Sequence, residues 1–138
     1  MVSINLKGRE IPLLYTSLEM KTIQEEIAPL SKAIRLVTGR NPEDENDTSM
    51  FGSAEHIGAL AKMVTILSNA GLEDAGQEAD LTEKKVMRAL RPNQLGYAIS
   101  VVSEAMAEGM RSEIPEKEDD GPVDVTLEQM KKKETKES

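Results

Sequence analysis

The only histidine of the chain, His56, follows Glu55 near the start of an apolar segment. Imidazole is the side chain that exchanges protons near neutral pH, so acid–base catalysis and metal binding are the chemistry to consider first. Either role needs a nucleophile or a second ligand at a suitable spacing, and the residues around His56 offer neither. We therefore interpret His56 as a plain residue of a first helical turn and predict no catalytic residue.

Oxygen-bearing side chains between Asp44 and Glu55 resemble the spacing of a calcium-binding loop. Counted from Asp44 as position 1, Asn46 occupies position 3, Thr48 position 5 and Glu55 position 12. Position 6 is Ser49, whereas the sharp turn of such a loop requires glycine. The chain has no cysteine, which excludes thiolate ligands and disulfides. We predict no metal ion and no cofactor.

The charge of the chain disfavours nucleic acid as a partner. The formal net charge is −8 and the isoelectric point is near 4.8, whereas phosphate binding depends on clustered lysine and arginine. Two expected helices over 80–91 and 92–111 resemble a helix-turn-helix, but the second opens with Asn93 and Gln94 and then becomes apolar and acidic. We predict no binding to nucleic acid.

The segment 53–71 is expected to form the helix around which the other elements pack. At 100° per residue its apolar side chains cover well over half of the circumference, so most sides of this helix should be covered. These side chains are Ile57, Leu60, Ala61, Met63, Val64, Ile66, Leu67 and Ala70. Ser53 can cap the start, and Gly71 can take the left-handed conformation at the end.

Capping, proline and glycine signals divide the rest of the chain. Residues 3–15 predict a β-hairpin that turns at Gly8 and carries Pro12 on an edge. A capping box of Thr16 and Glu19 begins a helix that Pro29 ends. In this helix Leu18, Ile23 and Ile27 keep helical spacing. The next helix stops at Gly39, and its expected inward residues are Leu30, Ala33, Ile34 and Val37.

The remaining segments are two polar stretches and two helices. Residues 40–52 predict the longest internal loop, and a second polar stretch follows residue 71. A helix should run from Asp80 or Thr82 to Arg91, and an amphipathic helix from Pro92 to about Arg111. We therefore predict a mainly α fold, a compact bundle of about five helices with a short N-terminal β-hairpin.

The composition changes after residue 112, which predicts one helical domain over residues 1–112 and a flexible, charged, disordered tail over residues 113–138. Val123, Leu127 and Met130 are spaced i, i+4 and i+7 in this tail. Such a strip can fold as a helix in the groove of a partner, and an unstructured tail is the alternative. No apolar stretch approaches the roughly 20 residues of a membrane span, so we expect a cytosolic protein without membrane contact.

The N-terminal sequence INLKGREIPLLYTSLEMKTIQEEIAPLSKAI and the later segment LTEKKVMRALRP resemble the tail assembly chaperones of long-tailed bacteriophages over roughly residues 2–110. This resemblance implies a non-enzymatic protein that binds the tape measure protein, a very long, aggregation-prone helical chain. It implies that the client stays soluble in the host cytoplasm while tail tube subunits polymerise around it, and that the chaperone is absent from the finished virion.

The resemblance also implies further partners. In many such phages a programmed ribosomal frameshift yields a longer form that recruits tail tube protein, and Lys131, Lys132 and Lys133 are compatible with a slippery coding run. In this interpretation the client or another subunit covers the Met63 and Ile66 side of the central helix, so self-association stays open. Two alternatives remain: a small acidic adaptor that regulates another protein, and a metal-dependent enzyme with converging carboxylates.

Overall fold

The structure is a computed structural model that describes residues 1–111. In chain order its elements are β1 (Ser3–Leu6), β2 (Arg9–Pro12), α1 (Ser17–Glu26), α2 (Leu30–Val37), α3 (Ala54–Asp74), α4 (Glu83–Ala89), the 3-10 turn η1 (Pro92–Gln94) and α5 (Leu95–Met110). The predicted mainly α fold with an N-terminal hairpin is confirmed. The predicted tail, with Val123, Leu127 and Met130, lies outside the described residues.

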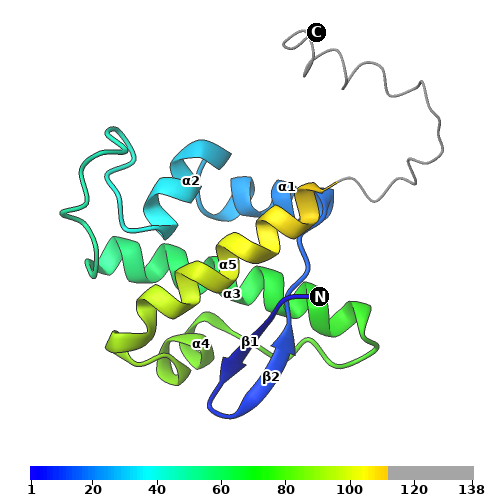
Figure 1. The fold of residues 1–138 in the computed structure, drawn as a ribbon. Coiled ribbons are helices and arrows are strands. Elements are labelled where there is room, and N and C mark those ends of the chain that lie inside the picture. Colours follow the sequence, from blue (N-terminus) through cyan, green and yellow to red (C-terminus); the bar gives the residue numbers. More distant parts are fainter. Residues whose placement is uncertain (112–138) are drawn as a thin grey trace, which may run out of the picture.

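The central position of α3 is also confirmed, since it packs against α1, α2, α4, α5 and β2. In Figure 1, α5 crosses α3, with α1 and α2 toward one side and α4 and the hairpin toward the other. Most of the apolar arc of α3 is buried, including Leu60, Met63, Val64 and Leu67. Because this helix contacts almost every other element, it forms the core of the domain.

The hairpin β1–β2 turns through the two residues Lys7 and Gly8, both with positive φ. Such a two-residue turn matches the right-handed twist of the flanking strands, and glycine accommodates it without steric cost. The antiparallel register is Ser3↔Pro12, Ile4↔Ile11, Asn5↔Glu10 and Leu6↔Arg9. Helices cover both outer edges: the amide of Asn5 donates to the Tyr97 hydroxyl of α5 at 2.8 Å, and β2 packs on α3.

The capping box of α1 is present as predicted. The Thr16 side chain accepts from the backbone of the first turn, and the Glu19 carboxylate accepts from the Thr16 amide at 2.9 Å. Leu18, although it keeps helical spacing with Ile23 and Ile27, is exposed over 63% of its surface. The buried positions are Glu19 and Ile23, four residues apart, and Leu18 lies about 100° from Glu19 around the helix.

The buried face of helix α2 is narrower than predicted. Pro29 precedes it at the N-cap, and Gly39 with a φ of 82° follows its end, as the proline and glycine signals indicated. Ala33 and Val37 define its buried face, whereas Ile34, one position further round, is exposed rather than inward. Apolar spacing alone therefore identified the helix but overestimated the width of its buried face.

The predicted end of the central helix at Gly71 is wrong, because α3 continues to Asp74 and the positive φ belongs to Gly76. Gly71 has a different role in the helix interior. A Cβ atom at Gly71 would lie 1.9 Å from the carbonyl oxygen of Pro12 in β2. The absent side chain lets the hairpin lie directly on α3, which is a packing requirement and not a helix cap.

The last helices follow the predicted order. Thr82, rather than Asp80, caps α4, and its hydroxyl accepts from the amide of Lys85 at 3.2 Å. The expected single helix over 92–111 begins instead with the 3-10 turn η1, which leads directly into α5. Near its other end, a Cβ atom at Gly109 would lie 2.3 Å from the carbonyl oxygen of Tyr15. The β2–α1 connection therefore lies directly on α5, as β2 lies directly on α3.

Among residues 1–111, no helix combines the length and the apolar character needed to cross a membrane.

Candidate functional site

An apolar groove lies between the end of the 40–52 loop, the N-terminal half of α3 and the α4–α5 corner. Its volume is about 570 Å³. The residues that line it are Phe51, Gly52, Ile57, Leu60, Ala61, Met87, Leu90, Pro92 and Leu95. These residues are apolar side chains and one glycine, so the lining offers shape and apolar surface but no group for acid–base or nucleophilic chemistry.

The groove has a buried floor and exposed walls. Leu60, Ala61 and Leu95 belong to the core and form the floor. Phe51 and Met87 stand on the walls with 52% and 41% of their surfaces exposed. Large apolar side chains that are exposed around a hollow are typical of a protein-binding surface, because their burial by a partner releases ordered water.

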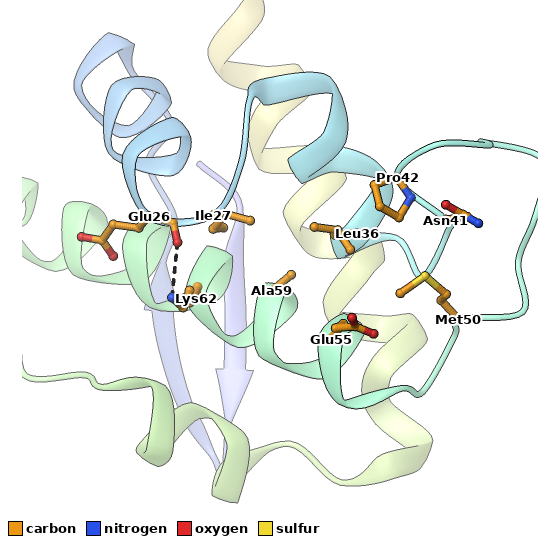
Figure 2. A pocket seen from close by; sticks show the side chains of 9 residues that line it. All are labelled: Glu26, Ile27, Leu36, Asn41, Pro42, Met50, Glu55, Ala59 and Lys62. Atoms are coloured by element: carbon orange, nitrogen blue, oxygen red, sulfur yellow. Dashed lines mark hydrogen bonds between the residues drawn. The ribbon is translucent and has the colours of Figure 1, made fainter.

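A second hollow, the mixed pocket, lies on the other side of the loop end and has a volume of about 470 Å³. Its lining residues are Glu26, Ile27, Leu36, Asn41, Pro42, Met50, Glu55, Ala59 and Lys62, which Figure 2 shows as sticks. The Lys62 ammonium donates to the main-chain carbonyl of Glu26 at 3.3 Å. Glu55, Ala59 and Lys62 are spaced i, i+4 and i+7, so one face of α3 forms a wall of this pocket.

Residues Met50 to Gly52 separate the two hollows. Met50 lines the mixed pocket, whereas Phe51 and Gly52 line the apolar groove. A buried histidine holds this segment in place: the amide of Gly52 donates to Nδ1 of His56 at 2.8 Å. The Phe51 and His56 rings lie 4.9 Å apart between centroids. His56 therefore positions one wall of the apolar groove.

The hydrogen bonds of His56 define its protonation state. Since Nδ1 accepts from Gly52, the proton of a neutral ring lies on Nε2, which donates to the Val37 carbonyl at 3.0 Å. The side chain is fully buried, and this burial lowers the pKa of His56 from its ordinary value of 6.5. The bond to Val37 acts in the opposite direction but is the smaller effect.

His56 does occupy the first turn of α3 as predicted, but its role as a buried link was missed. The side chain joins the end of α2, the end of the 40–52 loop and the start of α3. The sequence signal that could have indicated this role is the N-cap at Ser53, whose hydroxyl accepts from the His56 amide at 3.1 Å. This cap places His56 in the turn whose side chains face the preceding loop.

The oxygen donors of the calcium-like spacing do not converge. The Asp44 carboxylate accepts from the amide of Asn46 at 3.0 Å, which is a local turn contact, and Glu55 lies at the mixed pocket instead. Within residues 1–111, no group of three or more histidine, aspartate and glutamate side chains is arranged to hold a metal ion. The loop over residues 40–52 is thus stabilised by local hydrogen bonds from main-chain amides to aspartate and asparagine side chains, and not by converging carboxylates.

Of the sequence-predicted partner residues, Met63 and Ile66 are described by the structure, and neither lines the apolar groove. The chain's own core fully buries Met63, and Ile66 is half-buried against that core, so Ile66 is the one of the pair with exposed surface. Val123, Leu127 and Met130 lie outside the described residues. Residues 40–52 and any exposed methionine were further candidates for a binding surface, and Phe51 and Met87 fall within these two groups. Neither was named individually, because periodicity does not separate a binding face from a packing face.

Comparison with known proteins finds no matching family model, no similar curated protein and no similar solved structure.

Proposed function

We propose that the protein is a tail assembly chaperone that binds an apolar stripe of the tape measure protein in its apolar groove. The single observation that carries this proposal is the groove itself, with its apolar lining and its exposed Phe51 and Met87. A helix with apolar side chains at i, i+3, i+4 and i+7 is the usual occupant of such a surface. The resemblance of residues 2–110 to tail assembly chaperones supplies the identity of the client.

The lining of the groove suits a client with many similar apolar stripes. Methionine is unbranched and polarizable, so Met87 adapts to side chains of different shape. The floor of the groove is fixed by the core, because Leu60 and Leu95 are buried. A rigid floor with an adaptable wall binds a class of helices rather than one sequence, as a chaperone of a very long helix requires.

The charge of the chain supports the proposed role in a second way. The chain contributes a net charge of −8 to a complex with the client. Like charges make such complexes repel one another, which opposes aggregation of the apolar client. In this proposal the protein acts in the host cytoplasm, leaves before the virion is complete, and recruits tail tube protein through a longer product of the same gene. The coding run at Lys131 to Lys133 is where that longer product would arise.

Co-expression tests this function. A helical fragment of the candidate tape measure protein is produced alone and together with the full chain, and its soluble fraction and its elution on size exclusion are measured. We expect the fragment to be insoluble alone, and soluble and co-eluting in the presence of the chain. A fragment that stays insoluble in both cultures, with no co-eluting chain, would overturn the proposal. Groove-dependent binding to another protein instead would favour the adaptor alternative.

A further inference from the structure

The border of the apolar groove at α4 is basic, although the protein as a whole is acidic. Between residues 83 and 91 the chain carries four basic side chains and one acidic side chain. Lys84 lies at i−3 of the groove residue Met87 in α4, so it is a neighbour of Met87 on the helix surface. Arg91 stands between the groove residues Leu90 and Pro92, after the end of α4. Within residues 1–111, Lys84, Arg88 and Arg91 form no salt bridge. This border attracts an acidic occupant.

The C-terminal sequence of the same chain has the complementary pattern. Residues 113–130 contain seven acidic side chains and a single lysine. Among them, Val123, Leu127 and Met130 are spaced so that a helix would present them on one face. An apolar strip with acidic flanks matches an apolar groove with a basic border in both respects.

The connection to the domain is long enough for the strip to reach the groove. Leu95 lines the groove at one end of α5, and the described chain leaves the other end at Met110. The 16 residues of α5 separate these ends by about 24 Å. Residues 112–122 precede the strip, and eleven residues span up to about 36 Å when extended and about 18 Å on average as a coil.

We propose that residues 123–130 dock in the apolar groove of their own chain, with Leu127 at the centre and the acidic residues toward α4. The segment then acts as an internal substitute for the client. It covers Phe51 and Met87 when no client is present, and a client helix must displace it. This regulatory consequence rests on the proposed function, whereas the docking itself is a property of the isolated protein.

The absence of cysteine permits a direct test on the full chain. A nitroxide spin label is attached to Gln129→Cys, and NMR peak intensities are measured for the methyl group of Met87 and the amide of Phe51. We expect both signals to lose intensity in the labelled chain and to recover when Leu127→Asp is added. Raised salt should also restore them in part, because charge attraction is screened. Leu127 lies outside the described domain, so Leu127→Asp should leave the fold of residues 1–111 unchanged. Unchanged chemical shifts of the core residues are the control for this expectation.

Other patterns would overturn the inference. A tail that does not dock would broaden signals near its attachment, at the end of α5 and in α1, equally with and without Leu127→Asp. In a second sample, isotope-labelled chains without a spin label are mixed with spin-labelled chains without isotope. Broadening of Phe51 and Met87 in this mixture, as strong as its composition allows, would show docking between copies and would also contradict the proposal. Neither result depends on a client. Failure of the docking is therefore distinguishable from failure of the chaperone function, which the co-expression experiment tests.

Discussion

The imidazole of His56 donates through Nε2 to the carbonyl of Val37 at 3.0 Å and accepts through Nδ1 from the amide of Gly52. One buried side chain thus joins the last residue of α2 to the segment before α3, although the two elements are separated by a polar loop. The arrangement holds only while the ring is neutral, because a protonated Nδ1 cannot accept a hydrogen bond. The wall of the apolar groove at Phe51 depends on this neutral ring.

The first prediction is that the stability of the fold falls as the pH drops below about 6.5. Burial lowers the pKa of His56 in the folded chain, so below its ordinary value of 6.5 the unfolded chain binds more protons than the folded chain. The free energy of unfolding therefore decreases with falling pH, with a slope of at most about 1.4 kcal/mol per pH unit from one group. Urea unfolding between pH 7.5 and about 5, where aspartate and glutamate remain mostly ionised, measures the slope.

His56→Asn is the matched variant for this measurement, because it removes the titrating group and keeps a polar side chain. We expect it to be less stable at pH 7.5 and to lose most of the pH dependence in the same interval. His56 is the only histidine, so no other imidazole contributes. Equal slopes in the two proteins would contradict the buried, neutral assignment.

The second prediction concerns the contact between α3 and β2. Gly71→Ala places a Cβ atom 1.9 Å from the carbonyl oxygen of Pro12, and backbone cannot yield as a flexible side chain can. We expect a loss of about 3 kcal/mol in the free energy of unfolding. Gly58→Ala in the same helix has nothing within 4 Å, so it should stabilise the protein by about 0.5–1 kcal/mol. Similar stabilities of the two variants in urea would show that β2 does not lie on α3 as described.

The third prediction concerns the start of α1. Thr16→Ala removes the side chain that accepts from the first turn and that pairs with Glu19, so about 1 kcal/mol of stability should be lost. Thr22→Ala, at a partly exposed position of the same helix away from its cap, is the control and should change the stability by less than about 0.5 kcal/mol. Thermal unfolding followed by circular dichroism compares them. A neutral Thr16→Ala would argue against the capping box.

Local signals predicted the element boundaries well wherever a single residue type determines the backbone. Gly8 at the hairpin turn, Thr16 at the cap of α1 and Pro29 before α2 were all identified, because each acts on neighbouring residues only. The wide apolar arc of 53–71 likewise predicted the central position of α3. These features depend on sequence spacing and capping chemistry, which are visible without the fold.

Features that depend on residues far apart in the chain were not predictable. Gly71 looked like a helix end because its contact, Pro12, is almost sixty positions away, and Gly76 took the terminating conformation instead. His56 looked ordinary because its partner Val37 belongs to another helix. The groove was missed for the same reason, since Phe51 and Met87 become neighbours of one hollow only in three dimensions.

The fourth prediction is that an acidic substitution in the groove separates client binding from folding. Met87→Glu introduces a charge at a side chain that is 41% exposed, so the fold should persist. An apolar helix should bind more weakly, because it would bury the carboxylate without a partner. Leu18→Glu is the matched control, because Leu18 is a more exposed apolar residue on α1 outside the groove. Both variants should unfold at nearly the same urea concentration as the unaltered chain.

The affinity of these three proteins for a helical tape measure fragment, measured by isothermal titration calorimetry, tests the central claim most directly. We expect the unaltered chain and Leu18→Glu to bind equally, and Met87→Glu to bind at least about tenfold more weakly, which corresponds to about 1.4 kcal/mol. Equal binding by all three folded proteins, or a loss with Leu18→Glu alone, would contradict the assignment of the apolar groove as the client site.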